Sequence, residues 1–394
     1  MLPGFPATGF ACVGRTMNVS PWMDELTQLH GRLGDCFLRK EPRDRALSYL
    51  KGLLGPSERK NGWQLAEQAG EKVPYGVQRL LRVAQWDTDG VRDCLHDYVK
   101  DNFGFKGGAL VVDETGFIKK GTESAGVKRQ YCGTAGKVEN CQVGVFLYYS
   151  APGGGGAFLD RELYLPEDWV EDWERCDDAG VPKDTPFRTK PEQARIMLER
   201  ARAAGFQPEW TLGDAVYGSD PGLRRALEDW EWPYVMAIKT TEPVRTRAER
   251  GVIKRTALEV ARDLPAECWR RLSAGDGTKG PRAYDWATES LIVPGTKAGN
   301  HTLLVRRSLT DRDDIALFLV FTTRPTPLED MVRGAGLRWT IEAGFESAKG
   351  EVGLDHYEVR QWISWYRHIT LALIAHAFLA VIMARSAPAG KKES

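Results

Sequence analysis

The spacing of apolar residues changes along the chain, and this change predicts where helices give way to strands. Residues 22–29, 46–54, 61–67, 74–82 and 89–98 have helical spacing, which predicts a helical domain over residues 17–105. The pair 61–67 and 74–82 has the pattern of a short helix-turn-helix-like unit. In such a unit Gln78, Arg79 and Arg82 would be exposed. That face is either an ordinary solvated surface or a DNA contact.

After residue 105 the pattern changes to short apolar runs, which are typical of buried strands. Such runs occupy residues 109–112, 141–149, 157–164, 210–213, 233–239 and 315–322. Residues 190–204 and 220–228 predict helices between them, residues 127–133 a basic turn, and residues 166–187 a polar loop. This order favours an α/β fold, in which residues 106–239 and 316–385 form a mixed sheet with flanking helices.

Residues 240–315 have a different character, which predicts a β-rich insertion into the sheet domain. Residues 242–255 are basic and are expected to be mobile, and residues 268–286 are rich in Gly, aromatic and basic residues. Residues 287–293 and 301–307 predict a β-hairpin. The basic aromatic segment suits contact with a phosphate backbone and stacking on an unpaired base; an ordinary surface hairpin is the alternative. Residues 328–350 predict a helix, and residues 369–383 a buried core helix.

Composition limits the classes of partner. The 394 residues carry 54 Lys plus Arg and 54 Asp plus Glu, so any nucleic-acid surface must be local. Seven scattered cysteines without a C-x-x-C pair indicate reduced thiols, a cytoplasmic location and no zinc site. The apolar run 369–383 is shorter than the ~20 residues that span a bilayer. Residues 1–16 lack the features of a signal peptide, and we expect both they and residues 386–394 to be disordered.

Three carboxylates carry the candidate chemistry. Asp113 follows the buried run 109–112, Asp214 follows the run 210–213, and Glu342 lies in the helix predicted over 328–350. An Asp that starts a turn is commonplace, but the repeated arrangement and the third acid predict a site. Three such groups can hold two divalent cations side by side for phosphodiester chemistry. Arg338 and Lys349 fall near the face of Glu342, since helical steps of four and seven bring side chains together.

These segments resemble the DDE transposases of bacterial insertion sequences, and in particular insertion sequence family seven-oh-one. V-V-D-E-T-G-F contains Asp113, L-G-D-A-V-Y-G contains Asp214, and R-W-T-I-E ends at Glu342; these match the three catalytic acids of the family. W-R-R-L-S-A-G-D-G-T-K-G-P-R-A-Y-D-W and G-L-D-H-Y-E-V-R-Q-W also look like this family. The resemblance covers about residues 45–383.

The cut-and-paste branch of these transposases has a Y-R-E-K signature, which this chain reproduces in part. Arg338, Glu342 and Lys349 match its R-x3-E-x6-K portion. Ala335 stands where the signature has Tyr, and Trp339 and Tyr357 are the candidates to take over the role of that Tyr.

The resemblance implies a fold, an activity and partners. The fold would be RNase H-like, with the β-rich insertion between the second Asp and the Glu. Asp113, Asp214 and Glu342 would bind two Mg²⁺ or Mn²⁺ ions, and a homodimer would cut double-stranded DNA at terminal inverted repeats and join it to target DNA. The expected DNA contacts are Arg338, Lys349, Arg79, Arg82, Lys128, Arg129, Lys279, Trp269 and Trp286. The alternatives are an RNase H-like nuclease or resolvase without strand transfer, and a catalytically silent transposase that acts as a DNA-binding protein.

Overall fold

The first described part of the chain is helical. The computed structural model describes residues 20–249, 251–277, 280–296 and 300–386. Its opening helices are α1 (Ser20–Arg32), α2 (Lys40–Leu54), α3 (Gly62–Gln68), α4 (Tyr75–Arg82) and α5 (Thr88–Phe103). Side-chain caps fix two of their starts: Asn61 accepts from the first turn of α3, and Asp87 does so for α5. Residues 1–16 and 387–394, which are predicted to be disordered, lie outside the described residues, whereas Ser386, predicted to belong to the disordered tail, ends the last helix.

The central sheet has the RNase H-like order. Its strands are β1 (Ala109–Ile118), β3 (Lys137–Ser150), β4 (Gly156–Leu163), β5 (Trp210–Gly213) and β6 (Tyr234–Ile238). They lie in the order β4-β3-β1-β5-β6, in which β1 is antiparallel to β3 and parallel to β5. The mixed α/β fold predicted from the sequence is confirmed.

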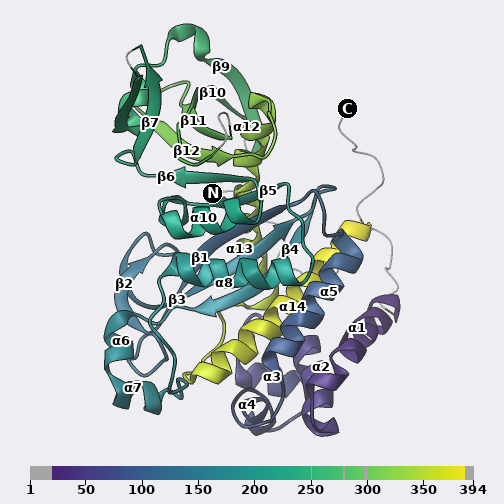
Figure 1. Cartoon of the computed structure of the whole chain (residues 1–394). Coiled ribbons are helices and arrows are strands. Elements are labelled where there is room, and N and C mark those ends of the chain that lie inside the picture. The colour runs from purple at the N-terminus through teal and green to yellow at the C-terminus, as the bar shows by residue number, and fades with distance from the viewer. Residues whose placement is uncertain (1–19, 250, 278–279, 297–299, 387–394) are drawn as a thin grey trace.

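The insertion continues this sheet. Strands β12 (Ile315–Phe321), β11 (His301–Arg307), β10 (Gly280–Ser290) and β9 (Arg270–Gly277) follow β6 in that spatial order (Figure 1). The hairpin of β7 (Pro243–Ala248) and β8 (Gly251–Thr256) forms a separate two-stranded sheet, which precedes α11 (Ala257–Arg262) and a 3-10 turn (Ala266–Cys268). The expectation of a mobile segment over residues 242–255 was therefore wrong, because backbone pairing orders the two strands.

Two other predictions need correction. The basic turn at residues 127–133 contains strand β2 (Lys128–Cys132), which pairs with the start of β3. The polar loop over residues 166–187 contains two short helices, α6 (Glu167–Glu171) and α7 (Trp173–Asp178). Asp172 caps α7 by accepting from the backbone N–H of Arg175.

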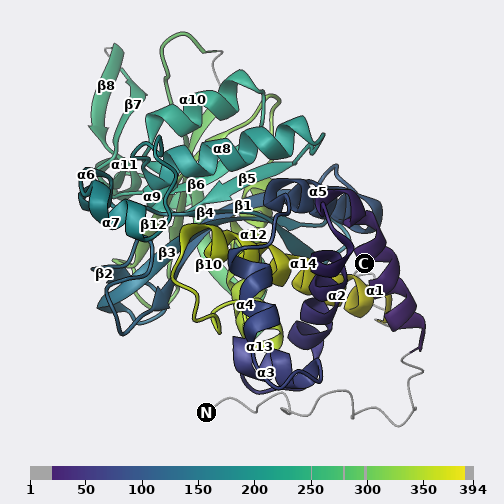
Figure 2. The ribbon, with the colours of Figure 1, turned by 90° about the horizontal axis from the view of Figure 1, so that it is seen from below.

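Helices cover both faces of the sheet. Figure 2 shows α8 (Lys190–Ala203) and α10 (Pro221–Asp229) on one side of the strands, and α13 (Trp339–Val352) and α14 (Trp362–Ser386) on the other. The short helix α9 (Ala215–Gly218) packs against β5 and β6. The helix predicted over residues 328–350 is present as α12 (Leu328–Leu337) and α13; the one residue between them, Arg338, keeps helical backbone angles (φ −56°, ψ −32°).

Helix α14 joins the N-terminal helices to the sheet. It packs against α2, α4, α5, α13 and β4, so all of them share one hydrophobic core. The Tyr49 hydroxyl and His368 Nδ1 are hydrogen-bonded at 2.8 Å across this junction. By length and composition α14 could cross a membrane, but 67% of its apolar stretch is buried inside the protein. This confirms the interpretation of residues 369–383 as a core helix.

Candidate active site

Strand register aligns the two aspartates. Strand β1 pairs in parallel with β5 up to Val111 and Leu212, so the residues two positions further are Asp113 and Asp214. Side chains two positions apart on a strand share a face, which brings both carboxylates to the same edge of the sheet. Asp214 also caps α9, since its Oδ1 accepts from Val216 N at 2.8 Å. Strand β1 itself continues to Ile118, so Asp113 lies inside the strand rather than at its end.

Arg338 connects the third acid to the first. Its Nη1 donates to Asp113 Oδ2 at 3.1 Å, and its Nη2 donates to Glu342 Oε1 at 2.8 Å. One guanidinium therefore bridges a strand of the sheet and helix α13. The Asp113 side chain is 17% exposed and that of Glu342 is 36% exposed, so the site opens towards solvent on the side of α13.

A fourth carboxylate, Glu114, belongs to the same cluster. It follows Asp113 on β1 and therefore points to the opposite face of the sheet. There Lys190 Nζ donates to its Oε1 and Tyr217 Oη donates to its Oε2, both at 2.6 Å. Sequence reasoning missed Glu114, although D-E is one motif, because nothing local indicates that α8 and α9 supply its partners.

Lys349 contacts the same face of β1 as Arg338 does. Its Nζ donates to Thr115 Oγ1 at 2.8 Å and to Thr134 Oγ1 at 3.1 Å. Thr115 is two positions after Asp113 and shares its face, so Arg338, which directly precedes α13, and Lys349 on α13 contact alternate residues of β1. Burial lowers the pKa of Lys349 from its ordinary value.

The acids repel one another. Burial raises the pKa of Asp113 to about 7; Arg338 opposes this shift, while Asp214 and Glu114 add to it. Burial and the nearby Glu114 also raise the pKa of Asp214. Carboxyl groups with raised pKa values beside further acids are typical of functional sites.

The donor set suits hard divalent cations, although the side chains are not arranged as ligands. Within the described residues, no three His, Cys, Asp or Glu side chains lie together in a geometry that could hold a metal ion. The guanidinium of Arg338 separates Asp113 from Glu342 and supplies positive charge between them. Oxygen donors and an excess of negative charge fit Mg²⁺ or Mn²⁺, provided that Arg338 moves aside.

Arg338 lies where α12 meets α13, and the insertion contacts the last turn of α12. Arg282 on β10 donates to Ala274 O at 2.9 Å and to Gly336 O at 3.1 Å. A side chain at Gly336 would collide with the carbonyl oxygen of Ala274, so the close approach requires glycine. The insertion is therefore attached directly to the segment that carries Arg338.

The other DNA-contact candidates lie apart from these acids. Gln78, Arg79 and Arg82 are exposed on α4, as a DNA contact requires. Lys128 and Arg129 are exposed on β2, where Lys128 pairs with Asp168 at 3.0 Å. Lys279 lies outside the described residues.

The aromatic candidates differ in their accessibility. Trp269 is half-buried under the guanidinium of Arg307, 3.7 Å from its ring centroid. Trp286 is buried against Phe318, so its predicted stacking on a base does not agree with its position.

The two candidates for the role of the signature Tyr also differ. Tyr357 is buried, and its hydroxyl donates to Gln142 at 2.9 Å. Trp339 is 52% exposed and follows Arg338 directly, whereas Ala335 is partly buried on α12.

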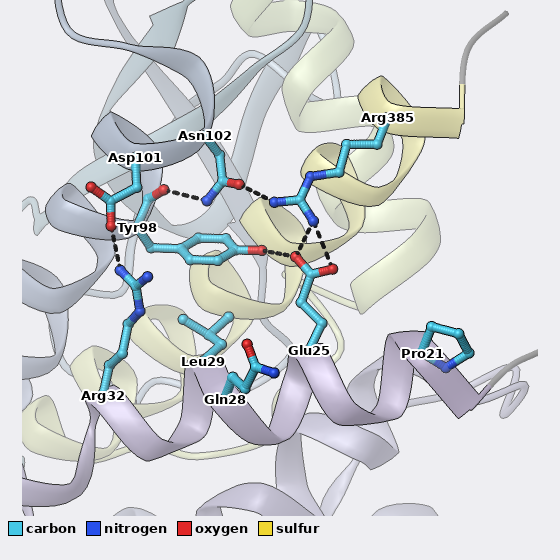
Figure 3. A pocket seen from close by; sticks show the side chains of 9 residues that line it. All are labelled: Pro21, Glu25, Gln28, Leu29, Arg32, Tyr98, Asp101, Asn102 and Arg385. Carbon is cyan, nitrogen blue, oxygen red and sulfur yellow. Dashed lines mark hydrogen bonds and ion pairs between the residues drawn. The ribbon is translucent and has the colours of Figure 1, made fainter.

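A cavity of about 430 Å³ between α1, α5 and the end of α14 is unrelated to this site (Figure 3). Arg385 pairs with Glu25 at 2.8 Å, and Arg32 pairs with Asp101 at 2.6 Å. These charged side chains of the cavity are thus paired with one another.

Comparison with known proteins gives concordant matches. Residues 32–262 match the family described as DDE superfamily endonuclease, and residues 188–378 match the transposase DDE domain. The chain is similar to a probable transposase for insertion sequence element IS701 from Microchaete diplosiphon. The two are 25% identical over an alignment of 326 residues, which covers 80% of this chain and 77% of that protein.

Proposed function

The chain belongs to the DDE superfamily endonucleases, and from this premise we propose that it is a DNA transposase that cuts the ends of an insertion sequence and joins them to target DNA. Membership of this family implies DNA binding and nuclease-type chemistry. Asp113, Asp214 and Glu342 would be the catalytic acids. The DNA substrates would be terminal inverted repeats and a target duplex, held by a homodimer.

Three carboxylates would hold two Mg²⁺ or Mn²⁺ ions. Paired cations of this kind promote attack by the nucleophilic oxygen and stabilise the leaving oxygen of an in-line displacement. The acids provide the negative charge that attracts such cations. In the absence of a cation, the carboxylates of Asp113, Asp214 and Glu114 repel one another.

Arg338 would have two successive partners. In the described conformation its guanidinium neutralises Asp113 and Glu342. Once these carboxylates take other partners, the guanidinium becomes free to bind a phosphate oxygen pair, for which its planar fork is suited. Lys349, which Thr115 and Thr134 orient, would contact a neighbouring phosphate with its remaining N–H.

The observation that supports this proposal best is the double ion pair of Arg338. It links Asp113 with Glu342, 229 positions later in the sequence, while the β1–β5 register aligns Asp113 with Asp214. Two acids from distant segments therefore share one cation, and the third, Asp214, follows the neighbouring strand at the same register.

The test compares two helix-capping aspartates. Asp214→Asn and Asp220→Asn both keep an N-cap, because Asn caps about as well as Asp. The substrate is a supercoiled plasmid that carries the DNA flanking the coding region on both sides, in Mg²⁺. We expect Asp214→Asn, like Asp113→Ala, to lose cleavage by at least about 100-fold and Asp220→Asn to retain it.

The products separate the alternatives. Cleavage without joined products would identify a nuclease or resolvase instead of a transposase. Binding of the flanking DNA without cleavage by the wild-type protein would identify a silent DNA-binding descendant. Cleavage by Asp113→Ala at the wild-type rate would show that the assignment of the acids is wrong.

A further inference from the structure

The β7–β8 hairpin is an ordered ribbon with two unlike faces. Its register pairs Arg245 with Lys254 and Arg247 with Val252 on one face, and Val244 with Arg255 and Thr246 with Ile253 on the other. In an antiparallel pair, residues that lie directly opposite project to the same side. The sequence of the hairpin therefore determines what each face presents.

The second face anchors the hairpin to the rest of the insertion. Val244 and Thr246 are buried there. Arg255 pairs with Asp263 and donates to Glu259 O at 2.8 Å, which fixes α11 against the ribbon. The backbone of Arg245 also accepts a hydrogen bond from Ile292 N at 2.8 Å.

The first face, formed by Arg245, Arg247, Lys254 and Val252, is exposed and cationic. We call it the ribbon face. Among the described residues, no carboxylate lies within ion-pair distance of its three cations. Arg245 and Lys254 are direct cross-strand neighbours, and like charges in this arrangement destabilise a sheet. An anion bound across the two strands would relieve this repulsion.

The surface beside the ribbon face adds to the positive charge. A groove of about 320 Å³ separates the hairpin from α10, and Arg225, Arg245 and Lys254 line it. The carboxylates in the groove already have partners: Glu242 pairs with Arg224 at 3.3 Å, and Glu228 with His301 at 3.0 Å. The carboxylates of the groove therefore do not neutralise Arg225, Arg245 and Lys254.

We infer that the ribbon face binds the phosphate backbone of duplex DNA, an inference that rests on the proposed function. A two-stranded β-ribbon has the width that the major groove admits, and its cations would lie along the phosphates at the rim. Figure 2 shows β7 and β8 on the other side of β1 and β5 from α3 and α4, and Figure 1 shows the same for β7. The ribbon face would thus hold a stretch of DNA distinct from any held by α4.

The experiment measures binding of duplex DNA in EDTA, so that cleavage does not interfere. The triple variant Arg245→Gln/Arg247→Gln/Lys254→Gln removes the ribbon face, and Arg255→Gln removes one charge from the opposite face of the same strand. We expect the triple variant to bind about tenfold or more weakly at ~0.1 M salt. The slope of log affinity against log salt should become shallower by about 3. End DNA and unrelated DNA should be affected alike, because phosphate contacts carry no sequence information.

The controls separate this inference from the proposed function. Arg255→Gln should bind with the wild-type slope, and circular dichroism should show all variants folded. If the triple variant binds DNA with the affinity and the salt dependence of the wild-type protein, the inference is overturned and the proposed function remains intact. A triple variant that changes only self-association, as measured by sedimentation, would also overturn it, since the ribbon face would then contact a second copy. Failure of the wild-type protein to bind DNA would overturn both.

Discussion

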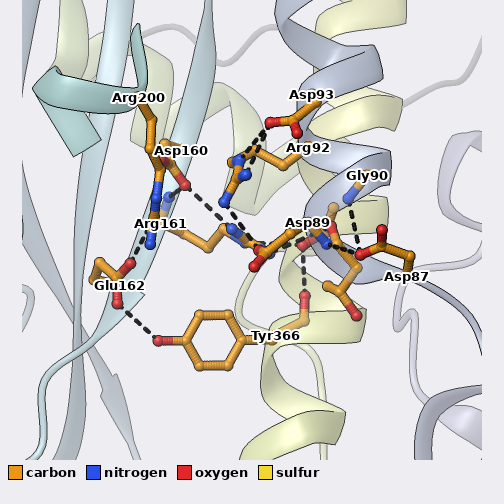
Figure 4. A network of polar contacts seen from close by, with 12 residues as sticks. Asp87, Asp89, Gly90, Arg92, Asp93, Asp160, Arg161, Glu162, Arg200 and Tyr366 are labelled. Carbon is orange, nitrogen blue, oxygen red and sulfur yellow. Dashed lines mark hydrogen bonds and ion pairs between the residues drawn. The ribbon is translucent and has the colours of Figure 1, made fainter. Parts of the chain in front are cut away.

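Two regions of this molecule place carboxylates against arginines, and the pKa of the central carboxylate is shifted in opposite directions in the two. The first joins α5, β4, α8 and α14, where Arg161 is buried against Asp160 (Figure 4). Arg200 contacts both Asp160 at 3.2 Å and Glu162 at 2.7 Å. Burial alone would raise the pKa of Asp160, but Arg161, Arg200 and Arg92 outweigh it and hold that pKa below its ordinary value.

The second region is the candidate active site, where Asp113 faces one arginine and two carboxylates. Burial raises its pKa to about 7, and Asp214 and Glu114 reinforce the shift. Both regions are built from the same chemical groups. The first neutralises its buried acids with protein cations, whereas the second leaves negative charge uncompensated. This difference agrees with the proposed roles, in which the first region is a structural ion-pair network and the second would bind cations from solution.

The largest expected effect comes from a matched pair of arginines. Arg161 pairs with Asp160 and Asp89, and Arg338 pairs with Asp113 and Glu342, so each bridges two acids. Arg161→Ala should lower the free energy of unfolding by about 3–5 kcal/mol, because it breaks a fully buried ion pair and leaves the buried Asp160 with Arg200 as its remaining ion-pair partner. Arg338→Ala should cost less than about 1 kcal/mol, because that side chain is 32% exposed and Asp113 can take up a proton.

Urea unfolding in EDTA, followed by tryptophan fluorescence, measures both variants. An equal loss in the two proteins would show that the contrast between the regions is wrong. A loss confined to Arg338→Ala would reverse their roles.

The next effect is a dependence on pH that differs in sign between the regions. The folded pKa of Asp113 lies above its ordinary value of 3.8, so its contribution to stability is complete below about pH 4 and is lost as pH rises through about 7. Asp113→Asn should therefore stabilise the metal-free protein at pH 8 by about 2–4 kcal/mol. The gain should disappear towards pH 4.

Asp160→Asn is the counterpart. The folded pKa of Asp160 lies below its ordinary value, so its contribution is present at neutral pH and is lost as pH falls through its folded pKa. This variant should be less stable than the wild-type protein at pH 7. Thermal unfolding in EDTA over this pH range checks both signs, and addition of Mg²⁺ should stabilise the wild-type protein but not Asp113→Asn. An Asp113→Asn protein no more stable than the wild type at pH 8 would contradict the uncompensated charge.

The elements that the sequence predicts well are those whose signal is local. The apolar runs before Asp113 and Asp214 are strands because they are buried on both faces. Strand β2 was missed because Lys128, Arg129 and Tyr131 are exposed; its stability comes from pairing with β3. The same holds for the β7–β8 hairpin, whose polar sequence has too few apolar residues to indicate a strand.

The candidate site was predictable to a similar extent. The order of the acids and the helical spacing of Arg338 and Glu342 are present in the sequence and suffice to nominate the residues. The bridge from Arg338 to Asp113 depends on how α12 and α13 pack against the rest of the protein, which includes the close contact of Gly336 with Ala274. That contact is a tertiary property of the insertion. The role of Glu114 likewise depends on two helices that come later in the chain.

The smallest expected effect concerns Glu114, which pairs with Lys190 on the face of β1 opposite to that of Asp113. Lys190 and Tyr217 hold it as the arginines hold Asp160, so it combines features of both regions. Glu114→Gln should cost about 1 kcal/mol of unfolding free energy, the usual value for a partly exposed ion pair. Cleavage should fall less than about tenfold if Glu114 positions β1 and α8 without binding a cation. Loss of its charge should also lower the pKa of Asp113, so the acid limb of the pH–rate profile should move to lower pH. Abolished cleavage, as in Asp113→Ala, would instead make Glu114 a ligand and shift the centre of the site to the α8 face of the sheet.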